Sequence, residues 1–176
     1  EVDDDLNEYK IFEASRAMTD FVDDLSNWYV RLNRKRFWGG GMTQDKLSAF
    51  QTLYTCLETV AKLMAPIAPF YADMLYSDLI AATGRDNVVS VHLAKFPEYK
   101  EEMIDKELEV RMQMAQDVTS MVLALRRKVN IKVRQPLTKI LIPVLDADTA
   151  RRIEAVKGLI MSEVNVKEIE LIENTT

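Results

Sequence analysis

The sequence predicts a mainly α-helical chain, in which an antiparallel helical bundle is followed by a small strand-helix-strand appendage. Glycine and proline number only five each among 176 residues, and helix-favouring Leu, Ala, Met, Glu, Lys and Arg are plentiful. Apolar residues recur at spacings of three and four from residue 9 to residue 129. Beyond that point, two short apolar runs rich in β-branched residues indicate strands. We therefore expect a helical domain over residues 1–135 and a small α/β subdomain over residues 136–176.

The first long helix is expected to run from about Tyr9 to Arg36. Residues 1–6 have a helical composition without an N-cap, and we interpret them as the end of a truncated first helix. Three glycines at positions 39–41 should end the long helix. We interpret Trp28, Tyr29 and Phe37 as packing residues. The apolar stripe of the helix consists of Phe21, Leu25, Trp28 and Leu32.

Capping and breaking residues predict the next elements. Thr43 suits the N-cap of a second helix, which Pro66 and Pro69 should break. A shorter helix follows to about Ala82, and residues 83–97 form a connection with a short extended piece at 88–93. The apolar stripe of the second helix consists of Leu47, Phe50, Tyr54, Leu57, Ala61 and Met64.

A long helix is expected from about residue 98 to residue 129, with Arg111 reaching from its apolar face toward solvent. Strands are then expected at 137–145 and 164–172, joined by a helix that Asp146 or Asp148 caps. Two strands are too few to be stable alone, so they must pack on other elements. The apolar face of the long helix consists of Ile104, Leu108, Ala115, Val118, Val122, Leu125 and Val129.

The distribution of charge suggests an oriented electrostatic surface, although the net charge is −5. Acidic residues dominate positions 1–24, whereas 25–44 and 118–145 contain cations without acids. Solvated helix ends would give the same pattern, because the helix dipole favours cations there. A single cysteine and a single histidine exclude a disulfide and a Cys/His zinc site. No apolar run is long enough to span a membrane, so we expect a cytoplasmic protein.

One face of the first long helix has the chemistry of an RNA contact. Asn27, Arg31 and Arg34 are spaced at i, i+4 and i+7, and Trp38 would extend this line if the helix continued. Arginine pairs with phosphate through its planar fork, and tryptophan stacks on unpaired bases. Alternatively, Asn27 has a structural role and forms a hydrogen bond with a neighbouring loop.

Several segments resemble the isoleucyl-tRNA synthetase family, in the order in which that family has them. The most characteristic is LSNWYVRLNRKRFW at 25–38, and LETVAKLMAPIAPFYADMLY at 57–76 is similar to a segment that the valyl and leucyl enzymes share. Three shorter segments agree with the isoleucyl family: SVHLAKFP at 90–97, IKVRQPL at 131–137 and NVKEIEL at 165–171. The resemblance covers nearly the whole chain.

The resemblance implies the anticodon-binding helical domain of a class I synthetase. The parent enzyme would use ATP and Mg²⁺ to attach isoleucine to its tRNA, and would remove misloaded valine in an editing domain. The expected tRNA contacts are the exposed stripe, with two phosphate partners beside it and a second contact in the loop after the long helix. These residues are Asn27, Arg31, Arg34, Trp38, Lys35, Arg36, Lys132 and Arg134.

The family's ATP-binding motifs, His-Ile-Gly-His and Lys-Met-Ser-Lys-Ser, do not occur in this sequence, and His92 matches neither. We therefore expect no catalytic residue, metal site or cofactor in this chain. The expected partners are isoleucine tRNA and the other domains of the synthetase, without membrane or DNA. The alternative is a structural scaffold of the same or a related valyl or leucyl enzyme, with no anticodon specificity of its own.

Overall fold

The computed structural model describes residues 1–85 and 88–173, and it divides into two compact units, Glu1–Tyr99 and Lys100–Thr176. Each unit is described by itself. The chain is mainly helical and ends in a strand-helix-strand unit, as predicted, and its two strands form a parallel sheet. No helix among the described residues is long and apolar enough to cross a membrane.

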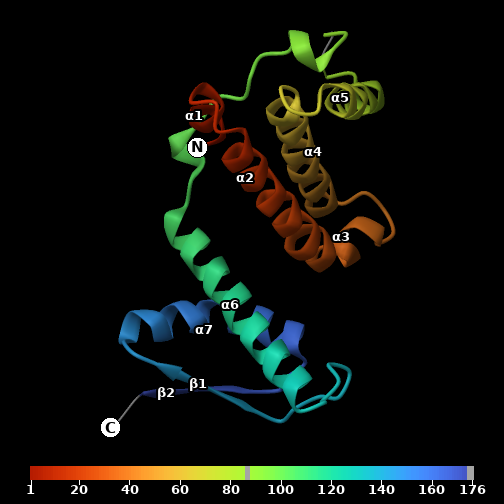
Figure 1. Cartoon of the computed structure of the whole chain (residues 1–176). Helices are drawn as coiled ribbons and strands as arrows, with labels where there is room; N and C mark the ends of the chain where they lie inside the picture. The colour runs from red at the N-terminus through yellow and green to blue at the C-terminus, as the bar shows by residue number, and fades with distance from the viewer. Residues whose placement is uncertain (86–87, 174–176) are drawn as a thin grey trace. The chain divides into compact units, whose positions relative to one another are not determined.

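The first unit begins with α1 (Val2–Asn7), α2 (Ile11–Asp24), the π-helix η1 (Leu25–Val30) and α3 (Arg34–Trp38), which follow one another along the chain (Figure 1). The single regular helix predicted from residue 9 to residue 36 is therefore wrong in detail. The backbone leaves helical geometry at Asn33 (φ −90°, ψ 9°), whose amide nitrogen donates to the Tyr29 carbonyl at 2.8 Å. The Asn33 side chain thus binds a backbone carbonyl that the helix uses for its own hydrogen bonds.

The remaining elements of this unit are α4 (Gln44–Met64), α5 (Pro69–Thr83) and the 3₁₀ turn η2 (Val91–Leu93). Thr43 caps α4 as predicted, since its hydroxyl accepts from the Lys46 amide at 3.2 Å. Pro69 begins α5, and Gly84 ends it with a φ of 62°.

The extended piece predicted at 88–93 is corrected, because Val91–Leu93 forms a turn. The Asp73 carboxylate accepts from the Ser90 hydroxyl at 2.7 Å and from the Val91 amide at 2.8 Å. These hydrogen bonds hold the chain against α5 and hold the pKa of Asp73 below its usual range. Residues 86–87 of the predicted connection lie outside the described residues.

The core of the first unit uses smaller side chains than the predicted stripes. Leu25 is buried as expected, but Phe21 and Leu47 are exposed. Alanine at positions 49, 61, 65 and 72 is almost fully buried, and Tyr76 is fully buried among such residues. The elements therefore approach closely through alanine contacts, which an apolar spacing pattern does not distinguish.

The second unit consists of η3 (Glu101–Met103), α6 (Lys106–Lys128), β1 (Ile140–Val144), α7 (Ala147–Val164) and β2 (Ile169–Glu173). The predicted strand-helix-strand order is confirmed, and the strands are parallel with Ile140 opposite Ile169. Asp146 caps α7 by accepting from the Thr149 amide at 2.6 Å. One apolar cluster joins α6, β1, α7 and β2. This compact unit begins at Lys100 and includes α6, because α6 packs on α7.

The long helix α6 differs from its prediction in two ways. It begins at Lys106 instead of residue 98, because the Asp105 carboxylate caps it by accepting from the Leu108 amide at 2.9 Å. Its buried face at the C-terminal end contains Arg126, which is 2% exposed, whereas Leu125 is 62% exposed. Val129, also predicted to be buried, is equally exposed.

Candidate nucleic-acid interface

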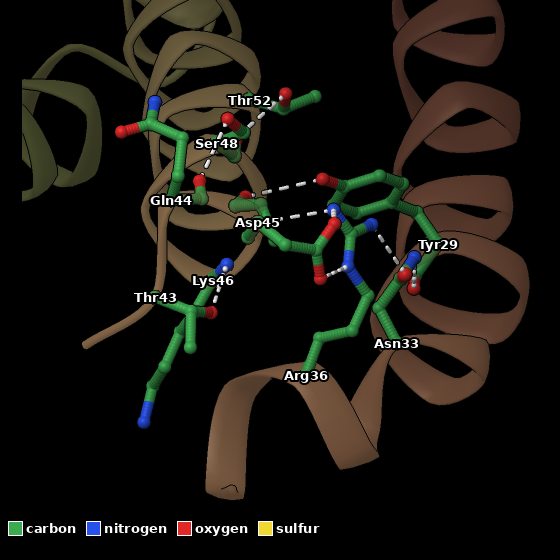
Figure 2. Close-up of polar contacts among 10 residues, drawn as sticks. Tyr29, Asn33, Arg36, Thr43, Gln44, Asp45, Lys46, Ser48 and Thr52 are labelled. Carbon is green, nitrogen blue, oxygen red and sulfur yellow. Dashed lines mark hydrogen bonds and ion pairs between the residues drawn. The ribbon is translucent and has the colours of Figure 1, made fainter. Parts of the chain in front are cut away.

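A network of polar contacts fixes the short helix α3 to the start of α4 (Figure 2). The Arg36 guanidinium donates to both Asp45 carboxylate oxygens, from Nε at 2.8 Å and from Nη2 at 2.7 Å. Its Nη1 donates to the Asn33 side-chain oxygen at 2.8 Å. The bidentate contact lowers the pKa of Asp45 and raises that of Arg36. Arg36 therefore joins α3 to the start of α4. These contacts do not test its predicted role as a phosphate partner.

Aromatic packing beneath this network turns one side of α3 inward. Phe37 is 8% exposed, and its ring lies 6.3 Å from the Tyr29 ring centroid and 5.1 Å from that of Phe50. The Tyr29 hydroxyl donates to the Ala49 carbonyl at 3.1 Å, and its ring reaches toward α4 in Figure 2. The interpretation of Tyr29 and Phe37 as packing residues is confirmed.

The residue after Phe37 faces the opposite way. Trp38 is 78% exposed, and the Arg34 guanidinium carbon lies 5.6 Å from its ring centroid, a cation–π distance. Lys35 is exposed on the same short helix. Lys46 donates to the Gly39 carbonyl at 2.7 Å, which ties the end of α3 to α4. An indole face and two cations are therefore presented on a fixed support.

Asn27 and Arg31 lie in and just after the π-helical segment. Both side chains are exposed, and the Arg31 Nε donates to the Asn27 carbonyl at 2.7 Å. The predicted spacing assumed 100° per residue, whereas a π-helix bonds i to i+5 and turns less per residue. Arg34 and Trp38 are brought together, while the two earlier residues belong to another turn. We call these exposed residues, with Lys35, the α3 surface (Asn27, Arg31, Arg34, Lys35 and Trp38).

Sequence reasoning missed two residues that position this surface. Asn33 breaks the helix, and Asp45 holds Arg36 across the glycine loop. Asp45 had a weak signal, because an acid in the first turn of a helix is favoured by the helix dipole. The pairing of Asp45 with Arg36, nine residues earlier, had no signal in the sequence, because it depends on the path of the glycine loop.

The other predicted contact residues lie in a loop of the second unit. Lys132 and Arg134 are both exposed, and the loop follows directly after α6. A cavity of 340 Å³ is lined by Arg127, Lys132 and Val133 together with neighbouring residues. Three of the loop's carbonyls accept hydrogen bonds from the buried Arg126. Cationic side chains therefore project from a backbone that is held from within.

The sequence of this chain matches a known protein family. Residues 1–142 match the family described as the anticodon-binding domain of tRNA ligase. The chain belongs to this family. It is 78% identical over 174 residues to isoleucine–tRNA ligase of Bacteroides fragilis, a match that covers 98% of this chain and 15% of that protein. The corresponding enzyme of Porphyromonas gingivalis is 60% identical, over 99% of this chain and 15% of its own length.

More distant relatives carry the same name. Isoleucine–tRNA ligase of Clostridium novyi is 43% identical over 96% of this chain and 16% of its own length. This anticodon-binding domain therefore spans about one sixth of the curated relatives that it matches. In such a domain, an exposed indole beside guanidinium and ammonium groups can stack on an unpaired base and bind phosphates.

Proposed function

We propose that this anticodon-binding domain binds the anticodon stem and loop of isoleucine tRNA through the α3 surface. The observation that carries the proposal is Trp38, an aromatic side chain 78% exposed beside Arg34 on a rigidly held helix. An exposed indole is already accessible, so binding needs no rearrangement to expose it. Every unpaired base has a face on which the indole can stack. Arg34, Arg31 and Lys35 would then neutralise phosphates, while Asn27 can hydrogen-bond a base edge.

The basic loop with Lys132 and Arg134 is proposed as a second contact with the same tRNA. Both side chains are exposed cations on an ordered turn, which suits phosphate binding. We also propose that, in the intact enzyme, residues 1–135 form the tRNA-binding domain. The helices of that domain would pack as an antiparallel bundle. The family match to residue 142 supports a boundary near there.

The relatives' name, isoleucine–tRNA ligase, suggests that the whole protein joins isoleucine to tRNA. From the resemblance to the synthetase family, we propose that it does so in the cytoplasm with ATP and Mg²⁺. Within residues 1–85 and 88–173, no group of three or more His, Cys, Asp or Glu side chains is placed to hold a metal ion. The sequence also lacks the two ATP-binding motifs of the family. We therefore propose that the chemistry belongs to other domains of the enzyme, which are partners of this one.

Titration of the chain with isoleucine tRNA at several salt concentrations tests the proposal. If the two surfaces contact about five phosphates, the log–log slope of the binding constant against salt should be about −3.5 to −4.5. A tRNA with an altered anticodon should bind more weakly, because the α3 surface would lose contacts with the changed bases of the loop. A slope near zero would refute phosphate binding, and equal binding of both tRNAs would favour the scaffold alternative.

A further inference from the structure

We propose that Arg126 is a positioning residue that shapes the basic loop at residues 131–135 and turns Lys132 and Arg134 outward. This inference rests on the proposed tRNA contact of the loop. Sequence reasoning placed Arg126 in a solvent-exposed basic segment, but the side chain is 2% exposed. A guanidinium buried this deeply cannot itself reach a phosphate, so its effect must pass through its neighbours.

Three loop carbonyls converge on one nitrogen of this side chain. Nη2 donates to the carbonyls of Lys132 at 2.9 Å and Val133 at 3.3 Å, and also to that of Gln135. Nε and Nη1 have no hydrogen-bond partner among the described residues. Burial of a charge costs stability unless it is paired. A buried arginine with two unpaired nitrogens is therefore not expected to increase the stability of the fold. Its hydrogen bonds direct the loop carbonyls toward the interior.

Asn165 holds the same loop from a second element. Its side-chain nitrogen donates to the Val133 carbonyl at 2.8 Å and to the Arg134 carbonyl at 3.2 Å. Four consecutive carbonyls, from residue 132 to residue 135, are thus bonded from below by two side chains. The cavity of 340 Å³ beside the loop means that apolar packing supports it little on that side. Side-chain hydrogen bonds therefore support its shape together with the backbone hydrogen bonds of the turn.

The geometry makes a specific prediction about substitution. Because one terminal nitrogen makes the hydrogen bonds to all three carbonyls, a single substitution removes them together. Arg126→Met keeps an unbranched apolar side chain and removes the donor, so the carbonyls lose their partner. In the 176-residue chain, hydrogen exchange of the Gln135 amide, which bonds the Lys132 carbonyl at 3.0 Å, should accelerate roughly tenfold or more.

Arg127→Met is the matched control, because it makes the same chemical change at an exposed neighbour on α6. Exchange of the Gln135 amide should not change in this variant. Should Arg126→Met fail to fold, Arg126→Gln gives the same test, because its polar side chain is two bonds shorter and does not extend to the position of Nη2. Asn165→Gly tests the second support of the loop separately, since glycine tolerates the φ of 52° there and only the two side-chain hydrogen bonds are lost. Unchanged exchange in the folded Arg126 variant would overturn the inference.

Binding of isoleucine tRNA supplies the second readout. Arg126→Met should weaken binding and reduce the salt slope by about 1.4 to 1.8, the value for two lost phosphate contacts. The double variant Lys132→Ala, Arg134→Ala should do the same, and adding Arg126→Met to it should change nothing further. If that double variant binds like the parent chain, the proposed loop contact fails, while exchange still decides the role of Arg126. An additional loss in the triple variant would overturn the positioning role.

Discussion

Replacing the neighbouring aromatic residues Phe37 and Trp38 separately by alanine should affect two different properties. Phe37 is 8% exposed and packs against Tyr29 and Phe50, so its removal leaves a cavity between α3 and α4. Phenylalanine-to-alanine changes in cores cost about 3–5 kcal/mol of folding free energy. The ring of Phe50 is itself 41% exposed and can relax, so we expect a value near the lower end.

Trp38→Ala should leave folding almost unchanged, because 78% of this side chain is already in water. Substitutions of this kind usually change stability by less than about 0.5 kcal/mol. Loss of one stacked base costs about 1–3 kcal/mol of binding free energy. The tRNA affinity should therefore fall by about 5- to 150-fold.

Urea unfolding followed by circular dichroism measures the first effect, with hydrogen exchange assigning the transition to residues 1–99. Titration with isoleucine tRNA measures the second. Phe70→Ala is the control, because this aromatic residue is 91% exposed on α5, and it should change neither property. A Trp38→Ala variant that unfolds as easily as Phe37→Ala would refute the orientation of α3. A stable Trp38→Ala variant with unchanged tRNA affinity would refute the stacking role.

Three further predictions concern residues that hold the elements of the first unit in place. Arg36→Met and Asp45→Asn should each weaken tRNA binding without lowering the salt slope by a full phosphate contact, and a double-mutant cycle should show that their effects are not additive. Hydrogen bonds depress the carboxyl pKa of Asp45 and Asp73 below the model-peptide value of 3.8, so their stabilisation is complete above that pH. It should be lost as pH falls through the lower folded values, and acid melting curves of Asp73→Asn should show a smaller loss. Gly41→Ala should destabilise by about 1–2 kcal/mol in urea unfolding, because its φ is 74°, whereas the unconstrained Gly40→Ala should not.

Elements that depend on local chemistry could be predicted from the sequence. Thr43 and Asp146 cap helices through their own side chains, and Pro69 opens α5, because each of these effects involves residues at most three positions away. The strand-helix-strand order also followed from a change in apolar pattern. Such features need no knowledge of the tertiary fold.

The predictions that failed depended on partners distant in sequence. The turn at Val91–Leu93 forms because Asp73 lies 17 residues before Ser90, on another helix. The buried face of α6 contains Arg126 because a loop folds back over it. An apolar periodicity assigns such a position to solvent, since a buried charge contradicts the rule on which the periodicity is based.

The candidate site shows the same division. The sequence placed the exposed indole and its neighbouring guanidinium on one line, and the structure brings Arg34 and Trp38 together. It did not reveal the π-helical turn that separates Asn27 and Arg31 from this pair. It also could not show that Arg36 pairs with Asp45, because that contact depends on the fold of the glycine loop.

The two basic segments of this acidic chain share one arrangement. In each, one arginine bonds protein groups and holds the backbone that carries the remaining cations. Arg36 fixes α3 through Asp45, and Arg126 fixes the loop at 131–135 through its carbonyls. Arg36 binds its acceptors through the planar fork of the guanidinium, whereas Arg126 binds the loop carbonyls through one terminal nitrogen. A count of cations therefore overstates the charge available to RNA, and the salt slope should follow the exposed cations alone. A measured slope that required Arg36 or Arg126 as phosphate partners would contradict this division.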